Sequence, residues 1–501
     1  MNKSEKVVKH RLHPVSMLYF MVTVVQESFS FIWLFPLIVL YVHQHISEQI
    51  SPLAIGIVSV VVLLMLFLIV VVLRWRSFTY EIHEQAIYIE SGLFVTKKRW
   101  VTPDRIQSID STVRVYDHFF STRTLTIELA GGEESSITLS CISSEEEKRI
   151  RGVLGAQAGD KPADPFGESV IRLSKNDLIL HSLLSPRFGA VFTLLSVGFF
   201  KYLDVTEETY RNLLIYYLSS WFGANWIVLT LVILLFLSFA ISLLTTFTSD
   251  YDFTLHRNDK GELEITQGLF EKKKRTIAQN RIQALWIIER PLPRLLGYVS
   301  IEAVVIRNGQ DKETQKNLTL LPFVQKDMAL SILEPLTGYH VDSHLHRLTK
   351  KAKFSYMGIP FILGCLLAIP VWLFVPGLYH YAAPLIPLGL FFLGWMEYQK
   401  IGWNQSENFL TLQYGKVTRK TALIKRGRVQ WASLRQTALQ AKKHLASVRV
   451  AVASGKVKVS MGLRHIPLAE AEKIYRYTLK PKRGKTNITS VDQSASREAN
   501  G

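Results

Sequence analysis

Residues 92–107 read GLFVTKKRWVTPDRIQ, and this pattern returns twice further along the chain. Residues 268–283 read GLFEKKKRTIAQNRIQ, and residues 415–430 read GKVTRKTALIKRGRVQ. In each copy a glycine stands 13 residues before an arginine, and a glutamine follows two residues after that arginine. The positions are Gly92, Arg105 and Gln107, then Gly268, Arg281 and Gln283, then Gly415, Arg428 and Gln430. This fixed spacing predicts one structural unit in three copies.

The sequence around each copy alternates between apolar and polar residues, as in residues 78–83 and 124–129. A period of two is typical of half-buried antiparallel strands. Each copy then leads into a helix, because residues 144–147 have a capping-box pattern and Pro322 and Pro467 precede helical runs in the other two. Strands followed by one helix, in about 80 residues, predict a small split β-barrel with a C-terminal helix.

A long apolar pattern precedes each copy. A helix needs about 20 predominantly apolar residues to cross roughly 30 Å of hydrocarbon. Six runs are close to this length: residues 17–42, 53–73, 188–203, 226–247, 357–376 and 379–396. The third run is short, and the sixth contains Pro384 and Pro387. The sequence therefore predicts a membrane protein of mixed α and β structure, with six transmembrane helices in three hairpins.

Basic residues indicate the orientation of these hairpins, because Lys and Arg are enriched in cytoplasmic loops. Under the predicted topology, Lys201 and Arg211 are the only basic residues outside, while several precede the first run. We therefore expect both termini and all three domains to be cytoplasmic. The first run is too long for a signal-peptide core and no small-residue cleavage site follows it, so we interpret it as an anchor.

The predicted organisation alternates hairpins with domains. It comprises a cytoplasmic N-terminus (1–16), hairpin 1 (17–73), domain 1 (74–155), a linker (156–187), hairpin 2 (188–247), domain 2 (248–337), a basic linker (338–356), hairpin 3 (357–396), domain 3 (397–479) and a disordered tail (480–501).

The Gly-Leu-Phe, Lys-Lys-Arg and Arg-Ile-Gln elements behind a membrane hairpin resemble the bacterial pleckstrin-homology-like (PH-like) domain of the second type. With hairpin and domain present three times, residues 10–480 resemble the YdbT-type membrane proteins of Gram-positive bacteria. The resemblance implies a pleckstrin-homology fold, residence in the plasma membrane and no established biochemical activity. The third copy departs from the pattern, because it has Lys416-Val417 for Leu-Phe and no contiguous Lys-Lys-Arg.

The formal net charge of +18 is concentrated in the third copy. Residues 397–479 hold 16 basic and 4 acidic side chains, whereas residues 74–155 and 248–337 have net charges of −1 and +1. Each cation near an anionic inner leaflet contributes about 1 kcal/mol before screening. We expect an anionic surface or a partner to bind the third copy through Lys416, Arg419, Lys420, Lys425, Arg426 and Arg428. The alternative is that these cations only set the orientation of the spans.

Two further basic tracts are candidate sites for phosphate or an anionic lipid headgroup. They are Lys97, Lys98 and Arg99, and Lys273, Lys274 and Arg275. Since both domains are nearly neutral, a strand edge protected by charge is the favoured alternative. The repeated Arg and Gln are interpreted as structural, because alternation would place each pair on one face of a strand.

Other polar features are weaker candidates. His340, Asp342, His344 and His346 alternate as metal ligands can, but no second pair follows, so we interpret them as a polar connector. Glu27 falls in the middle of the first apolar run, where we interpret it as a packing residue rather than part of a proton path. No catalytic motif, cofactor site or metal site is predicted, and no nucleic-acid-binding pattern accompanies the basic residues.

The sequence therefore favours a non-enzymatic scaffold or binding module of the cell envelope. Its predicted partners are the lipid bilayer, anionic headgroups and another membrane protein. A transporter or export component is the alternative, since prolines interrupt the last two apolar runs. A membrane-embedded lipid enzyme is a third hypothesis, for which the histidine run gives the only hint.

Overall fold

The computed structural model describes residues 9–32, 52–83, 86–93, 95–129, 136–154, 171–185, 187–205, 208–258, 261–305, 317–341, 344–374, 381–453 and 459–479. These residues form two compact units, which divide between Arg281 and Ile282. Residues Leu320–Val324 belong with the first unit. The division falls inside the second sequence copy, so that copy contributes to both units.

Each copy begins with a strand of two residues that lies ahead of its membrane hairpin. These strands are β1 (His10–Arg11), β8 (Ile171–Arg172) and β15 (His346–Arg347). Each pairs antiparallel with the first strand after the hairpin, which is β2 (Thr79–His83), β9 (Thr254–Arg257) or β16 (Gly402–Gln405). The two ends of each hairpin therefore meet in one sheet, an arrangement that the sequence analysis missed.

After the hairpin, each copy contributes three strands to a first sheet and three to a second. The remaining first-sheet strands are β3 (Ala86–Ser91) and β4 (Lys97–Val101), β10 (Glu262–Gln267) and β11 (Lys272–Ala278), and β17 (Phe409–Tyr414) and β18 (Arg419–Lys425). The second-sheet strands are β5 (Ile106–Val113), β6 (Thr122–Leu129) and β7 (Ser136–Ser143), β12 (Ile282–Glu289), β13 (Tyr298–Val305) and β14 (Leu318–Gln325), and β19 (Val429–Arg435), β20 (Leu445–Val452) and β21 (Val459–Pro467).

Two helices complete each copy. A short helix follows the first strand of the second sheet: α4 (Val115–Phe120), α10 (Pro291–Leu295) or α14 (Ala438–Lys442). A longer helix ends the copy: α5 (Ser144–Val153), α11 (Lys326–Thr337) or α15 (Leu468–Leu479). In the first copy α5 contacts strands of both sheets, and the residue that caps it is Ser143, one position before the predicted Ser144. Pro322 instead lies inside β14, four residues before α11 begins.

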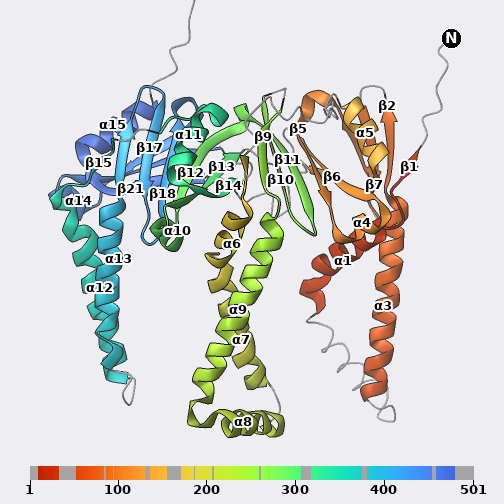
Figure 1. Ribbon diagram of the computed structural model, residues 1–501, viewed down its shortest axis with the longest axis horizontal. Helices are drawn as coiled ribbons and strands as arrows, with labels where there is room; N and C mark the ends of the chain where they lie inside the picture. The colour runs from red at the N-terminus through yellow and green to blue at the C-terminus, as the bar shows by residue number, and fades with distance from the viewer. Residues whose placement is uncertain are drawn as a thin grey trace, which may run out of the picture. The chain divides into compact units, whose positions relative to one another are not determined.

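The sheets do not close within one copy but join consecutive copies (Figure 1). One seven-stranded sheet has the order β7-β6-β5-β11-β10-β9-β8, and the other has the order β14-β13-β12-β18-β17-β16-β15. The first copy therefore pairs with the second through β5 and β11, and the second pairs with the third through β12 and β18. We call these pairings the first joint and the second joint.

The repeated residues mark the backbone turns of each copy. Gly92, Gly268 and Gly415 have φ angles of 127°, 112° and 127°. A Cβ added at any of them would collide with the carbonyl oxygen three residues later, so only glycine fits this tight turn.

Each repeated arginine ends a 3-10 turn between the two sheets: Pro103–Arg105, Gln279–Arg281 or Arg426–Arg428. The strand register shifts at each repeated glutamine, between residues 106 and 108, 282 and 284, and 429 and 431. The glutamine therefore occupies a β-bulge. The prediction that Arg and Gln share one face of a strand was wrong, because a turn and a bulge separate them.

Four described helices are long and apolar enough to span a membrane, in place of the six predicted. They are Ile57–Ser77 within α3 (Pro52–Ser77), α7 (Arg187–Val205), α9 (Trp226–Asp250), and Lys350–Phe374, which contains α12 (Lys353–Phe374). Of the other two predicted spans, the first begins with α1 (Ser16–Ile32) and continues outside the described residues. The sixth forms α13 (Leu385–Lys400), which has 16 residues and packs along α12.

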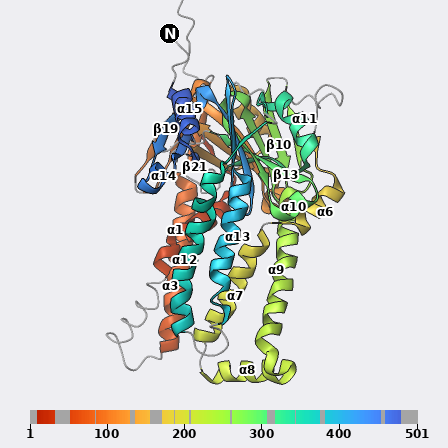
Figure 2. The ribbon, with the colours of Figure 1, turned by 90° about the vertical axis from the view of Figure 1, so that its left-hand side faces the viewer.

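The connection between α7 and α9 is itself helical. Helix α8 (Glu208–Phe222) lies across the far ends of α7 and α9, at a steep angle to both (Figures 1 and 2). Its exposed side chains include Tyr210, Tyr216, Tyr217 and Trp221. Aromatic side chains of this kind are enriched at the membrane–water interface.

Two glycines of the first copy provide a test of the turn. Gly92→Ala should lower the stability of this copy by about 2 kcal/mol or more, because alanine is strained at positive φ and has no room there. Gly152→Ala is the matched control: it lies in α5 with open space around it, so alanine should be neutral or stabilising.

The thiol of Cys141 reports the opening of this copy. Cys141 is fully buried, and burial and the neighbouring Asp117 raise its pKa to about 12, so it should react with maleimide only when the fold opens. With Cys365 replaced by serine, Gly92→Ala should speed the labelling of Cys141 and Gly152→Ala should not. Equal labelling rates in both variants would contradict the conclusion that only glycine fits the turn at position 92.

Candidate functional site

The second basic tract, Lys273 to Arg275, is built into the first joint. In β11, Lys273 lies opposite Thr112 and Lys274 opposite Ser111 of β5. Lys274 Nζ is 2.6 Å from Glu264 Oε1 on the neighbouring strand β10. The repeated Arg281 donates from Nη2 to the carbonyl oxygen of Ile106 at 3.2 Å, which ties the 3-10 turn of one copy to β5 of the preceding copy. Burial lowers the pKa of Arg281.

A buried carboxylate organises the second joint. The Glu289 side chain at the end of β12 is only 4% exposed and pairs directly with the Arg419 guanidinium of β18. Arg294 and Lys326 each lie 3.5 Å from the same carboxylate. One residue further along β18, Lys420 Nζ lies 5.4 Å from the centre of the Trp286 ring. Arg419 and Lys420, two of the three predicted binding residues of β18, are therefore engaged within the protein.

The hydrophobic core also crosses the second joint. Ala284, Trp286, Ile288 and Val304 of the second copy belong to one buried cluster with Ala422, Ile424, Leu445 and other residues of the third. Removing β12 would therefore expose apolar side chains on both copies. The third sequence copy therefore shares its core with residues of the second.

Two cations at the end of β18 lie over aromatic rings. Lys425 Nζ lies 4.4 Å from the centre of the Tyr339 ring, and the Arg426 guanidinium lies 4.6 Å from that of Tyr477. The buried Tyr339 hydroxyl donates to the carbonyl oxygen of Ile282 at 3.0 Å. Burial, followed by the neighbouring Arg428, lowers the pKa of Lys425. These contacts close the second joint at its other end.

The first basic tract has a different setting. Lys97, Lys98 and Arg99 lie on β4, which is the last strand of a four-stranded sheet. Lys98 Nζ lies 3.8 Å from Glu90 Oε1, and the same carboxylate is 3.4 Å from Lys9 Nζ. Glu90 raises the pKa of Lys9, whereas burial lowers that of Arg99. The neighbouring acid therefore offsets part of the positive charge of this tract.

An exposed aromatic side chain stands beside the first basic tract. Trp100 of β4 is 54% exposed, and its ring lies 5.0 Å from that of Tyr88 and 4.9 Å from that of His83. Tyr88 is directly opposite Trp100 in the sheet. The outward face of β4 therefore combines cations with an aromatic surface.

Several cations of the third copy lie where its hairpin meets the sheets. Lys400, at the end of α13, donates to the carbonyl oxygens of Lys416 and Val417, so the turn that holds Lys416 lies beside this helix end. Lys443 Nζ lies 4.1 Å from the ring centre of Phe354 at the start of α12. Lys442 next to it is exposed. We call Lys416, Lys442 and Lys443 the hairpin-3 cations.

The short helices lie on the same side of their sheets as the hairpins (Figure 1), and they expose large apolar side chains. Phe119 of α4 and Leu295 of α10 are both 82% exposed. The next residue, Phe120, has its ring 6.3 Å from that of His13, which immediately precedes the first hairpin. Exposed apolar side chains at the base of a membrane hairpin match the chemistry of the bilayer interface.

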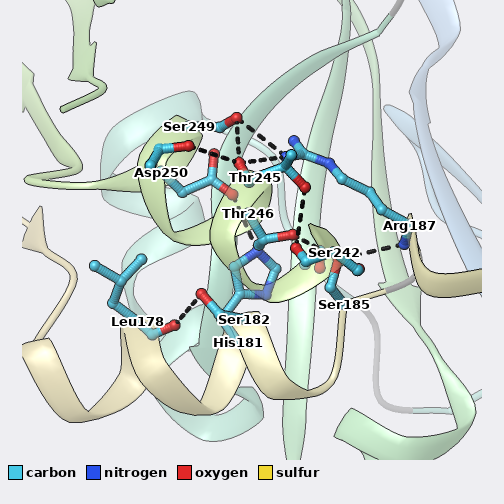
Figure 3. A network of polar contacts seen from close by, with 12 residues as sticks. Leu178, His181, Ser182, Ser185, Arg187, Ser242, Thr245, Thr246, Ser249 and Asp250 are labelled. Carbon is cyan, nitrogen blue, oxygen red and sulfur yellow. Dashed lines mark hydrogen bonds and ion pairs between the residues drawn. The ribbon is translucent and has the colours of Figure 1, made fainter. Parts of the chain in front are cut away.

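Figure 3 shows a polar cluster at the end of α9 that the sequence analysis missed. His181 Nε2 of α6 (Lys175–Leu183) lies 3.2 Å from Asp250 Oδ2, and Thr246 donates to Ser185 Oγ at 2.6 Å. All four side chains are buried. The cluster anchors α6, and through it the segment before the second hairpin, to the last turns of α9.

Arg187 extends this cluster to the start of α7 (Figure 3). It donates to the carbonyl oxygen of Thr245 at 2.9 Å and to Ser249 Oγ at 3.0 Å. The start of one span is therefore fixed to the end of the other. No periodic signal could have found these residues, because each is a single polar side chain at the border of an apolar run.

The weaker candidates have structural partners. Glu27 Oε2 lies 2.6 Å from Arg74 Nη2 in the last turn of α3, so Glu27 is not the isolated mid-span carboxylate that the sequence suggested. His340 contacts Glu334 at 3.0 Å, and the ring of His346 stacks on Trp403, while Asp342 lies outside the described residues. Within the described part of the chain, no group of three His, Cys, Asp or Glu could hold a metal ion.

Removal of the Glu289 charge tests the second joint. Glu289→Gln leaves Arg419, Arg294 and Lys326 without their shared carboxylate, so we expect a loss of about 2–4 kcal/mol in the free energy of unfolding. A single cysteine at the buried position Ala422 would report this as faster thiol labelling under mild denaturant. The control Glu334→Gln removes an exposed carboxylate and should change labelling little. Unchanged labelling of Glu289→Gln would contradict the role of the charge.

Comparison with known proteins is consistent with this architecture. The bacterial PH domain family (bPH_2) matches residues 30–158, 194–336 and 359–482. The chain is 25% identical to the UPF0699 transmembrane protein YdbT of Bacillus subtilis (strain 168) over 489 residues, which are 93% of this chain and 97% of that protein. No solved structure matches the chain. These matches confirm the resemblance found in the sequence: the chain belongs to the bacterial PH domain family, and it is a transmembrane protein with three such regions.

Proposed function

We propose that the protein is a non-enzymatic plasma-membrane scaffold, which holds three cytoplasmic PH-like domains as a binding module of the cell envelope. The observation that carries this proposal is the pair of joints, in which a strand of one copy completes a sheet of the next. Domains on flexible linkers would move independently, whereas shared sheets and a shared core hold neighbouring copies together. The Glu27–Arg74 pair supports a scaffold over a transporter, because it gives the carboxylate a structural partner.

We infer six passes through the membrane, with all three domains on the cytoplasmic side. The apolar run that begins in α1 and the helix α13 supply the two passes beyond the four long helices. The basic residues of the chain support this orientation, because Lys201 and Arg211 are the only ones in the predicted outer segments.

Cysteine labelling in intact cells tests this orientation. In a Cys365→Ser background, Asp204→Cys at the end of α7 should react with a membrane-impermeant maleimide added outside the cell. Lys442→Cys on the third copy should react only after the membrane is opened, because we place it in the cytoplasm. Labelling of Lys442→Cys in intact cells would contradict the proposed orientation.

We further propose that the hairpin-3 cations bind anionic lipid headgroups. The contacts of Lys416 and Lys443 with the ends of α13 and α12 support a position at headgroup depth. Other predicted binding residues, such as Arg419, Lys420 and Lys425, contact groups of the protein itself. Fewer cations are therefore left to bind lipid than the basic composition of the third copy suggests.

Native mass spectrometry of the full-length protein tests this lipid surface. In micelles with equal amounts of phosphatidylglycerol and phosphatidylcholine, Lys416→Glu/Lys442→Glu should lower the number of bound phosphatidylglycerol molecules at low salt. The difference should shrink at high salt, because the attraction is screened. The control Lys473→Glu/Arg476→Glu makes the same change of charge on exposed positions of α15, on the side of the sheets away from the hairpin (Figure 1), and should have no effect. Equal loss in both variants would contradict a specific surface.

A further inference from the structure

The two joints leave one strand edge open at each end of the series of copies. Strands β11 and β18 are covered by β5 and β12 of the preceding copy. Their counterpart in the first copy, β4, is the last strand of its sheet, and β19, the counterpart of β5 and β12, is the first strand of another. Among the described residues, no strand covers the outer edge of β4 or of β19.

The joints show which kind of strand fits such an edge. At the second joint, Glu289 lies opposite Arg419 and Leu285 lies opposite Leu423, and both Leu285 and Leu423 are fully buried. Between these pairs, Ile288 lies opposite Lys420, just as Thr112 lies opposite Lys273 at the first joint. The repeated lysine therefore faces an uncharged residue in both joints.

Because the repeats have the same spacing, each residue of β4 can be aligned with its counterpart in β11 and β18. Lys97 corresponds to Lys273 and Lys420, and Trp100 corresponds to Leu423. Lys97, Lys98 and Trp100 are exposed, whereas Leu423 in the covered strand is buried. The edge of β4 thus presents cations at positions that a neighbouring strand covers in the other two copies, and an apolar ring at the position that β12 covers in the third copy.

The open strand β19 of a second chain does not match this edge. In the same register, Arg435 of β19 would face Lys97, where the two joints have Ile288 and Thr112. Gln436 would take the place of Glu289, so the carboxylate of the second joint would be missing. Like charges directly opposite each other in a sheet are destabilising. Arg435 therefore acts against head-to-tail association of identical chains.

We propose that the edge of β4 is a docking site for one β-strand of a different polypeptide, the counterpart of β5 and β12 from a PH-like domain in that polypeptide. The incoming strand runs antiparallel to β4, with an apolar residue opposite Trp100 and a carboxylate four residues later, as Leu285 and Glu289 are spaced in β12. In this register the carboxylate faces Thr96 and lies on the same side of the sheet as Lys98. Backbone hydrogen bonds supply affinity, and the carboxylate selects the partner by its charge. The proposal rests on the scaffold function and names the partner of that scaffold.

The protein's own C-terminal edge can be converted into the proposed strand. Arg435→Thr/Gln436→Glu gives β19 the uncharged residue of the first joint and the carboxylate of the second, on two exposed positions. The full-length double variant in detergent micelles should self-associate with rising concentration, whereas the unaltered chain should remain monomeric, as measured by sedimentation with the detergent matched. A zero-length carbodiimide cross-linker should join the carboxylate introduced at position 436 of one copy to Lys97 or Lys98 of another.

A second pair of substitutions shows whether β4 is the acceptor. Adding Lys97→Glu/Lys98→Glu to the self-associating variant should weaken association at least tenfold, since it places acids close to Thr96, which the introduced carboxylate faces in this register. The control Arg172→Glu/Lys175→Glu makes the same change of charge at exposed positions of the second copy and should leave association intact.

Two results would overturn the proposal. If the double variant stays monomeric, β4 does not accept a carboxylate-bearing strand. If the unaltered chain self-associates and Lys97→Glu/Lys98→Glu prevents this, the occupant is a second copy and not a different polypeptide. Neither result affects cysteine labelling or lipid counting, so a failure here is distinguishable from a failure of the proposed function.

Discussion

Antiparallel pairing of β5 with β11, and of β12 with β18, is the constraint on which the rest of the structure depends. Each pairing closes the sheet of one copy with a strand of the next. The hydrophobic core follows the sheet, so Trp286 of the second copy is buried with Leu445 of the third. The compact units consequently divide between the sheets of the second copy, at Arg281 and Ile282, rather than at a boundary between copies.

The joints also explain why one repeated basic tract has three different settings. In β11 the tract is neutralised within its own copy, through Glu264 of the neighbouring strand β10. In β18 it is neutralised by the preceding copy, through Glu289. In β4 the neighbouring Glu90 is shared between Lys98 and Lys9, and the outer edge of the strand is open among the described residues. A repeated motif therefore does not imply a repeated ligand site, because the surroundings decide what its charges do.

The membrane side of each copy is organised by contacts at the ends of its hairpin. The strands β1, β8 and β15 pair with the strands that follow the hairpins, so each hairpin leaves from a closed base. Arg187 and the buried His181–Asp250 pair strengthen this base in the second copy. Exposed apolar residues of α4 and the hairpin-3 cations lie at the corresponding places in the first and third copies. These features suit a protein whose domains rest on the bilayer surface.

Local pattern was sufficient to predict the three copies, the strands that alternate between apolar and polar residues, the terminal helices and most of the apolar helices. Gly92, Gly268 and Gly415 are detectable because a tight turn with positive φ admits no other residue, which leaves the same mark in each copy. Alternation and apolar length are likewise properties of a few neighbouring residues. The placement of Arg105 and Gln107 on one strand face was wrong, since a 3-10 turn and a bulge interrupt the alternation from which that face was inferred.

The sequence by itself thus determined the repeated unit and its attachment to the membrane. Only the tertiary structure decided how the units join, because strand pairing connects residues far apart in the chain, such as Glu289 and Arg419, which are separated by 130 positions. The two-residue strands β1, β8 and β15 are too short to show any period. The openness of β4 is likewise invisible in its sequence, which closely resembles that of the covered β11. Whether this edge is open depends on whether a strand of another copy pairs with it.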